Sequence, residues 1–294
     1  MDFITALSQP RKLILDGATG TELNRRGVDT GLPLWSANAL LNEQDTKILQ
    51  QIHEDYLRAG ADIITTNTFR THHRALAPSG NAHRALELTR RAVDTARAAV
   101  TAVPSESRRF IAGSISTLDD CYRPDLVPND VALRAEHSER IHHLIECGVD
   151  LILIETINCI REAVIMAKLA VITGAPVVVS FVCNKDGRIL SGESLTEAAH
   201  ELLPLDVAIM GVNCGPTPDI AKPLAELRIV CGQEFPLTAY GNIGYADDDV
   251  GWVNTDSEDP KKYCQHAMYW DAKIIGGCCG TTPGHIRQLR TTLK

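Results

Sequence analysis

Residues 147–155 read CGVDLILIE, a glycine-containing joint followed by an apolar run that ends on Glu155. A run that is apolar at successive positions predicts a strand buried on both faces, as in a parallel sheet. Residues 59–67, AGADIITTN, repeat this order of joint and strand. Because Gly-x-Asp joints are common in α/β proteins, the echo is modest evidence for a repeated βα unit.

Short β-branched runs of the same kind recur along the chain, and helical patterns separate them. The eight predicted strands are Lys12–Asp16, Ile63–Asn67, Phe110–Ser114, Leu151–Glu155, Val177–Phe181, Val207–Cys214, Leu237–Tyr240 and Lys273–Cys278. Residues 43–57 carry apolar side chains at helical spacing, and Gly60 is a reasonable stop signal. A second helix is predicted over 81–100. Ser194–Glu197 is a capping box that opens a third helix, which runs to about Leu203.

Eight strand–helix units in 294 residues favour an α/β fold of the (β/α)8 TIM-barrel type, with residues 1–294 as a single domain. A doubly wound open sheet is the alternative, and it predicts a glycine-rich dinucleotide turn after the first strand. Residues 17–20, GATG, lack the G-x-G-x-x-G spacing. Only residues 242–262 are predicted to form a polar, Asp-rich loop.

Composition excludes several classes of function. The chain is 44% hydrophobic, which is ample for a core, and its net charge of −8 argues against a nucleic-acid partner. No apolar run reaches the roughly 18 residues of a membrane span, and no leader pattern is present. We therefore expect a soluble, cytoplasmic protein that acts on small molecules; its oligomeric state is left open. The nine cysteines do not suggest a disulfide framework.

In a barrel, chemistry is expected where the strands end. No predicted strand closes on a lysine, which disfavours a Schiff-base aldolase. The polar residues at the strand ends are Asp16, Thr66, Asn67, Ser114, Glu155, Ser180, Asn213, Cys214, Tyr240, Asn242, Cys278 and Cys279. Three cysteines thus close two strands, the sixth and the eighth, whose upper ends lie within reach of a common centre.

Cys214, Cys278 and Cys279 are the predicted metal ligands. The adjacent pair lies in a glycine cradle, GGCCG, which allows tight turns so that both sulfurs can face one point. Soft sulfur ligands select zinc, and three protein ligands with a vacant fourth position are a catalytic rather than a structural pattern. A vicinal disulfide is the alternative if the metal is lost. The remaining cysteines are predicted to be packing residues: Cys121, Cys147, Cys159, Cys183, Cys231 and Cys264.

The order of these motifs resembles the homocysteine S-methyltransferase family. The matching stretches are DGATGTEL (16–23), PLWSANAL (33–40), TTNTF (65–69), Glu155-Thr156, GVNC (211–214) and GGCCGTTPGHI (276–286). They cover nearly the whole chain. GGCCG with an upstream NC is highly specific, whereas the others are individually modest. The resemblance implies a (β/α)8 barrel whose three cysteines hold Zn²⁺ and act in catalysis through it.

The resemblance also implies a substrate site. Asp16 and Glu155 would hold the ammonium of homocysteine, and its carboxylate would take backbone amides near Gly17 and in the turn that contains Thr66. A helix cap or surface anchor is the competing interpretation of Asp16. Asn213 is a candidate for ordering the zinc site or binding substrate. Asn242 is a candidate for supplying an oxygen near the open zinc position.

Methyl transfer to homocysteine needs a thiolate. A free thiol has a pKa of about 8.5, so only about 3% is ionised at pH 7. A thiol that coordinates zinc loses its proton completely. The resulting gain in the thiolate population corresponds to roughly 2 kcal/mol. The remaining acceleration must come from holding the reacting groups in line.

The methyl donor is chosen by elimination. No cobalamin or folate module is expected after the barrel, which disfavours methylated cobalamin as the donor. Arg70 stands where the betaine-dependent enzymes have an aromatic residue, and a guanidinium facing the pocket would repel a trimethylammonium group. The expected donor is therefore a sulfonium, with S-methylmethionine preferred over S-adenosylmethionine, and the expected product is methionine. The same charge argument requires Arg70 to point away from other sulfonium donors.

Two other functions are kept as alternatives: a methyltransferase for another thiol or selenol, and a non-catalytic zinc-binding barrel. A zinc deaminase is disfavoured because H-x-E and P-C-x-x-C are absent. The pairs His72-His73 and His142-His143 are predicted on solvated surfaces. Trp35 is expected to pack over the first loop. Trp252 and the Asp247–Asp249 run are expected in a mobile loop able to cover the site.

Overall fold

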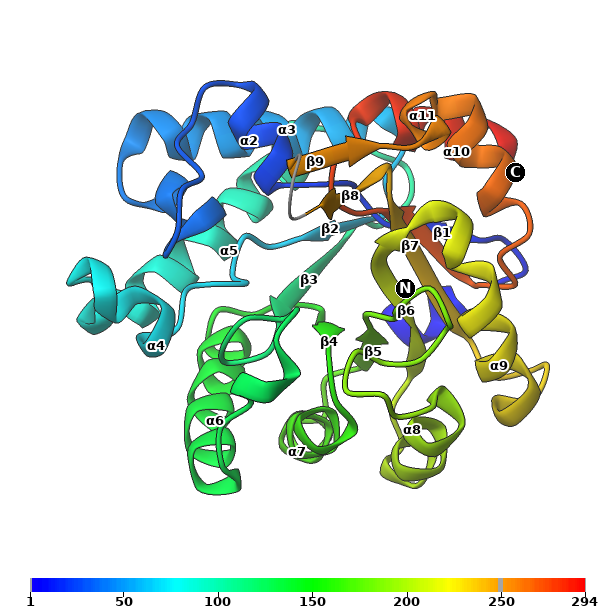
Figure 1. Ribbon diagram of the computed structural model, residues 1–294. Helices are drawn as coiled ribbons and strands as arrows, with labels where there is room; N and C mark the ends of the chain where they lie inside the picture. The colour runs from blue at the N-terminus through cyan, green and yellow to red at the C-terminus, as the bar shows by residue number, and fades with distance from the viewer. Residues whose placement is uncertain (1, 248–250, 294) are drawn as a thin grey trace.

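Eight parallel strands form the centre of the molecule (Figure 1). The computed structural model describes residues 2–247 and 251–293. The strands are β1 (Leu13–Ile14), β2 (Ile63–Thr65), β3 (Phe110–Ile115), β4 (Leu151–Ile157), β5 (Val177–Phe181), β6 (Ile209–Pro216), β7 (Leu237–Asn242) and β10 (Ile274–Gly277). Their order in the sheet is β1-β10-β7-β6-β5-β4-β3-β2.

The two edge strands of this order meet and close the sheet. Leu15 and Ile63 form a parallel bridge. The amide of Asp62 donates to the Ile14 carbonyl at 2.7 Å, and the amide of Asp16 donates to the Ile63 carbonyl at 3.0 Å. The predicted (β/α)8 barrel is therefore confirmed, and all eight predicted strand regions contribute to it.

Helices surround the barrel (Figure 1). They are α1 (Phe3–Leu7), α2 (Gly20–Arg25), α3 (Glu43–Ala59), α4 (His73–Leu76), α5 (Ala85–Ala102), α6 (Asp130–Glu146), α7 (Ile160–Val171), α8 (Leu195–Leu202), α9 (Ala221–Cys231), α10 (Pro260–Ala267) and α11 (Pro283–Thr292). Gly60 ends α3 in the left-handed region, at φ 108°, and the capping box at Ser194 opens α8, both as predicted. The helix expected over 81–100 begins as a short 3-10 turn, Ala82–Arg84, and is α-helical only from Ala85.

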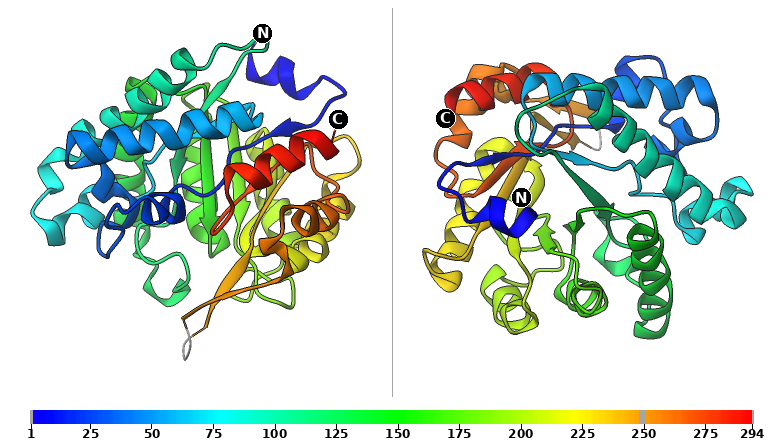
Figure 2. Two further views of the ribbon diagram at one scale, coloured as in Figure 1. Left: turned by 90° about the horizontal axis from the view of Figure 1, so that it is seen from above. Right: turned by 180° about the vertical axis from the view of Figure 1, so that it is seen from behind.

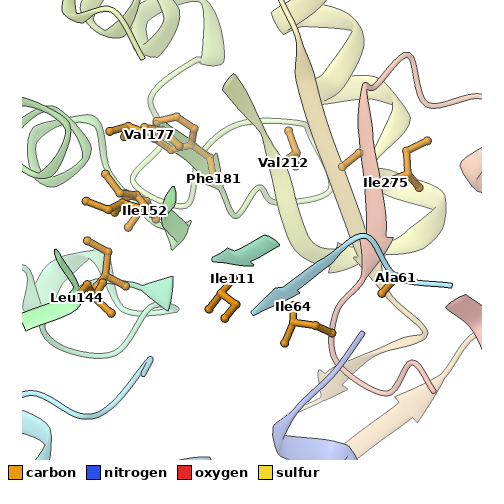
Figure 3. Packing of buried hydrophobic residues seen from close by; sticks show 14 of the residues in the cluster. Ala61, Ile64, Ile111, Leu144, Ile152, Val177, Phe181, Val212 and Ile275 are labelled. Atoms are coloured by element: carbon orange, nitrogen blue, oxygen red, sulfur yellow. The ribbon is translucent and has the colours of Figure 1, made fainter. Parts of the chain in front are cut away.

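Alternate residues of each strand face two different cores. Ile14 and Ile152 belong to the cluster between the strands and the helices, which Figure 3 shows from close by. Leu13 and Leu151 belong to a second cluster inside the barrel. Because both faces are buried, the strands read as continuous apolar runs rather than alternating ones.

Helix α1 covers the amino-terminal end of the barrel. Its Phe3 belongs to the interior cluster and packs edge-on against Phe110, with ring centroids 5.4 Å apart. Seen from behind, α1 lies over the centre of the barrel (Figure 2). The opposite end, where the strands terminate, is thus the one available for chemistry.

The two glycine joints noted in the sequence have equivalent roles. Gly60 and Gly148 both adopt positive φ, 108° and 74°. The carboxylate of Asp62 then accepts the amide of Ile14 at 2.9 Å, and that of Asp150 accepts the amide of Ile111 at 2.8 Å. Each aspartate therefore ties the start of its strand to a neighbouring strand.

The segment 242–262 differs from the predicted loop. Strand β7 continues to Asn242, and an antiparallel hairpin follows, β8 (Gly244–Asp247) with β9 (Gly251–Asn254). The hairpin projects from the barrel (Figure 2). A 3-10 turn at Asp256–Glu258 then leads into α10. Cross-strand pairing between the arms outweighs the polar composition on which the loop was predicted. The predicted site cover falls largely outside the described residues, because residues 248–250 and the Trp252 side chain are not described.

The histidine pairs are only partly solvated. His72 is 6% exposed, contrary to the prediction, because it lies close to Arg140 and His137 of α6. His142 is exposed, whereas His143 is largely covered. Within the described residues, no helix combines the length and apolar character needed to cross a membrane.

A substitution at Gly276 tests the packing of β10 against β1. An added Cβ would lie 2.6 Å from Leu15 Cβ and 2.9 Å from the Asp16 carbonyl oxygen. We expect Gly276→Ala to lower the free energy of unfolding by about 1–3 kcal/mol, measured by denaturant titration. Gly215→Ala is the matched control, since its nearest contact is 3.7 Å away. Equal destabilisation of both variants would contradict this account.

Candidate active site

A cavity of about 290 Å³ lies at the carboxyl ends of the strands. Seven of the nine predicted site residues line it: Asp16, Gly17, Thr66, Glu155, Cys214, Cys278 and Cys279. Asn213 and Asn242 are also buried but do not line the cavity. The barrel therefore brings most of the predicted residues to one place, although they span 264 positions of the chain.

The three cysteine sulfurs converge on one wall of this cavity. Cys214 lies in β6, and Cys278 and Cys279 follow β10. Their Sγ atoms all lie within 4.8 Å of one another, and those of Cys214 and Cys279 are 3.8 Å apart. A tetrahedral metal with sulfurs at about 2.3 Å requires sulfurs about 3.8 Å apart. The three thiols are therefore spaced to hold one metal ion.

The side chain of Asn242 holds the two cysteine loops together. Its Nδ2 donates to the Cys214 carbonyl at 2.8 Å, and its Oδ1 accepts the Cys279 amide at 2.9 Å. Since β7 lies between β6 and β10, a residue on β7 reaches both neighbours. That Asn242 supplies an oxygen near the open zinc position stays a prediction; in the structure its Oδ1 accepts the Cys279 amide.

Hydrogen bonding polarises the thiol cluster. Bonds from Cys278, Cys279 and the Tyr122 hydroxyl hold the pKa of the Cys214 thiol well below its ordinary value. The hydrogen bonds to Cys214 in turn raise the pKa of both neighbouring thiols, and burial and the charge of Cys214 act in the same direction. The cluster thus favours a single thiolate until a cation is shared among the three sulfurs.

Two buried carboxyl groups line the same cavity. Asp16 accepts the Thr65 amide and the Thr65 hydroxyl, both at 2.8 Å. Glu155 accepts hydrogen bonds from Ser114 and, at 3.2 Å, from the Tyr240 hydroxyl. Burial raises the pKa of Asp16 to about 8 and that of Glu155 to about 7, although these hydrogen bonds act in the opposite direction. Both groups are suited to accept a cationic ligand that favours their ionised forms.

The other predicted substrate contacts differ in kind. Gly17 lies against Tyr56, and an added Cβ would be 2.8 Å from that ring. The hydroxyl of Thr66 bonds within the barrel, because it donates to the Ala112 carbonyl at 3.2 Å.

Asn213 is turned away from the cavity, and its side-chain amide bonds the backbone and hydroxyl of Thr156. Thr156 has φ 57°, so Asn213 stabilises this left-handed turn after Glu155.

Tyr122 is a site residue that sequence reasoning missed. It lies in the loop after β3, and its hydroxyl is 3.0 Å from Cys214 Sγ. No motif surrounds it, so only the fold reveals its position. Cys121, which was predicted to be a packing residue, is buried as expected but also lines the cavity.

An aromatic pair and one arginine complete the wall. Trp35 and Phe69 meet edge-on with centroids 5.7 Å apart, and an added Cβ on Gly20 would overlap the Trp35 ring. Trp35 thus packs over the first loop as predicted. Arg70 lines the cavity. The structure thus places Arg70 beside the pocket, which is the position that the expectation against a betaine donor assumed.

Comparison with known proteins identifies the family. A model described as homocysteine S-methyltransferase matches residues 13–293. The chain belongs to the homocysteine S-methyltransferase family. It is therefore an enzyme of the methyltransferase class, and the family assignment made from the sequence motifs is confirmed.

Relatives from several organisms resemble this family member over nearly their full lengths. Homocysteine S-methyltransferase YbgG of Bacillus subtilis is 30% identical over 300 residues, 94% of this chain and 93% of that protein. Selenocysteine Se-methyltransferase of Brassica oleracea var. italica is 31% identical, covering 95% of this chain and 88% of that protein. The crystal structure of the metallated homocysteine methyltransferase MmuM from Escherichia coli aligns with a TM-score of 0.84 at 27% identity over 98% of each chain.

Replacing Asn242 tests how the cysteine loops are held. Asn242→Ala leaves the Cys214 carbonyl and the Cys279 amide unpaired, at a cost of about 1–3 kcal/mol. We expect a lower unfolding midpoint and faster reaction of the metal-free cysteines with a thiol reagent. Asn129→Ala, which removes only the cap of α6, should lower the midpoint and leave the thiol rate unchanged. An unchanged thiol rate in Asn242→Ala would refute the assigned role.

The raised pKa of Glu155 predicts a pH dependence of stability. The folded state keeps a proton that the unfolded chain releases, so the associated stability is complete below the ordinary pKa of 4.5 and is lost as pH rises through about 7. Glu155→Gln removes this titration. Its melting temperature should therefore fall less than that of the wild type between about pH 5 and about pH 8. Glu201→Gln, at an exposed position on α8, should behave like the wild type.

Proposed function

We propose that this protein moves a methyl group from a sulfonium donor to the thiolate of homocysteine in a zinc-dependent reaction that yields methionine. The observation that carries the proposal is the convergence of three thiols on a cavity that also contains two buried carboxyl groups. S-methylmethionine is the proposed donor, and S-adenosylmethionine is the second choice.

The donor set fits zinc. Three soft sulfur ligands favour zinc over magnesium, and the separation of Cys214 from Cys279 matches the tetrahedral value. The family relationship and the metallated form of MmuM support a metal at this place. Bound by Cys214, Cys278 and Cys279, zinc would lower the pKa of an added substrate thiol so that it reacts as the thiolate.

The chain's own residues would orient the acceptor. Asp16 and Glu155 are positioned to take the ammonium group of homocysteine, because both carboxyl groups face the cavity that the sulfurs line. Ser114 and Tyr240 hold the Glu155 carboxylate, and Thr65 holds that of Asp16. A bound ammonium offsets the cost of burying these charges and leaves the acceptor sulfur directed at the cysteines.

The transfer itself needs little further chemistry. The acceptor thiolate attacks the methyl carbon, a new S–C bond forms, and the bond between the methyl group and the donor sulfur breaks. The positive sulfonium and the negative thiolate both become neutral thioethers, so charge is conserved without a general acid. The contribution of the barrel is to hold the three atoms in line.

A selenol is the second candidate acceptor. One relative carries the name selenocysteine Se-methyltransferase and is 31% identical to this chain. Competition between homocysteine and selenocysteine for one methyl donor, followed by product analysis, separates the two acceptors. We also propose that residues 1–294 act as a single domain on small molecules. A cytoplasmic location stays a prediction.

A cysteine substitution tests the zinc chemistry. In Cys278→Ala we expect loss of bound zinc, measured by elemental analysis, and at least a roughly 30-fold fall in methyl transfer, since only about 3% of a free thiol is ionised at pH 7. Cys264→Ala is the control, because that buried thiol packs in the core outside the cavity. It should keep both zinc and activity. Full activity in Cys278→Ala would refute the proposal.

A further inference from the structure

Arg70 is the one basic side chain among the described residues that line the cavity. Its Nη1 makes a long hydrogen bond of 3.3 Å to the Pro33 carbonyl, and its Nε is buried without a hydrogen-bond partner. Among the side chains that the structure describes, no carboxylate lies within ion-pair distance of it. The Arg70 guanidinium is charged at physiological pH and forms no ion pair with a described side chain, although Asp119 is close enough to sense its charge.

Neighbouring arginines are fully engaged in the structure. Arg74 pairs with Glu136, its Nε lying 3.1 Å from the carboxylate. Arg140 donates to the carbonyl oxygens of Ser116 at 2.6 Å and Phe69 at 3.2 Å. Arg70 has only the one long contact to a carbonyl and no ion pair with a described side chain, and a partly buried charge with so few partners is costly. An anionic group of a ligand would remove that cost.

The depth of the charges suggests which ligand carries the anion. Asp16 and Glu155 are 1% and 8% exposed, on the floor of the cavity. Arg70 is partly exposed, and it donates to the carbonyl of Pro33. The residue before Pro33, Leu32, is 78% exposed and also lines the cavity. Arg70 therefore lies at the rim. An acceptor whose ammonium is on the floor leaves the rim for the donor, which must approach the acceptor sulfur from the open side.

We propose that Arg70 binds the carboxylate of the methyl donor, which makes the donor class an amino-acid sulfonium rather than a simple sulfonium. This inference rests on the proposed function. A guanidinium binds a carboxylate through two parallel hydrogen bonds, and the pair neutralises the charge that would otherwise repel the donor's positive sulfur. The requirement that Arg70 point away from a sulfonium donor is thereby removed, provided that the donor carries its own anion.

The test compares two donors on the zinc-loaded protein with homocysteine as acceptor. S-methylmethionine carries the carboxylate, and (3-aminopropyl)dimethylsulfonium lacks it. In the wild type we expect kcat/KM to be at least about tenfold higher for S-methylmethionine, because one charge-assisted contact is lost with the analogue. Arg70→Gln should raise the KM for S-methylmethionine about tenfold, leave the KM for homocysteine unchanged and bring the two donors to similar values.

Two matched variants and a binding measurement complete the design. Arg70→Lys should fall between the wild type and Arg70→Gln, because an ammonium cannot make the bidentate contact. Arg74→Gln, on the same segment but outside the cavity lining, should behave like the wild type. Binding of S-methylmethionine to the metal-free protein, followed by tryptophan fluorescence because Trp35 lines the cavity, should weaken in Arg70→Gln.

The outcomes separate the inference from the proposed function. A rise in the KM for homocysteine instead of the donor would assign Arg70 to the acceptor and overturn the inference. Equal losses with both donors in Arg70→Gln would also overturn it. If the wild type transfers no methyl group from any donor, the proposed function fails. The metal-free titration then decides the inference: binding that depends on Arg70 supports it, and binding that does not rejects it.

Discussion

One buried amide connects the two chain segments that carry the cysteines. Asn242 donates to the carbonyl group of Cys214 and accepts the amide of Cys279, and it does so from the strand that lies between β6 and β10. Both backbone groups thereby gain a hydrogen-bond partner in the interior. The sulfur separation of 3.8 Å is thus set by strand order and by one side chain. The proposed chemistry depends on this separation.

The cavity is electrostatically unfavourable until it is filled. Two buried carboxyl groups lie beside a cluster of thiols, and Arg70, whose Nε has no hydrogen-bond partner among the described residues, lines the same cavity. Burial raises the pKa of both carboxyl groups toward neutrality. In the proposed function, a zwitterionic acceptor and a zwitterionic donor would supply the counter-charges. These buried charges lower the stability of the empty protein and strengthen the binding of charged ligands, as is common at functional sites.

The accuracy of the sequence predictions follows how local their causes are. The strands and the caps at Gly60 and Ser194 were predictable because residue pattern and turn chemistry act within a few positions. The β8–β9 hairpin was missed because its polar arms suggested a loop. The burial of His72 was missed because it depends on packing against α6, about 65 residues away in sequence. Whether a side chain faces solvent is not determined by the residues next to it in sequence.

The site shows the same division. Sequence alone determined the barrel type and the family, and it predicted the three cysteines as metal ligands, because repeated strand–helix units and a glycine cradle around adjacent thiols are visible in the residue order. Only the tertiary structure decided that Asn242 and Asn213 bond the backbone, that Tyr122 reaches Cys214, and that Arg70 lines the cavity without an ion-pair partner among the described side chains. These properties arise when segments far apart in the chain meet at one end of a closed barrel, and no short stretch of sequence encodes such a meeting.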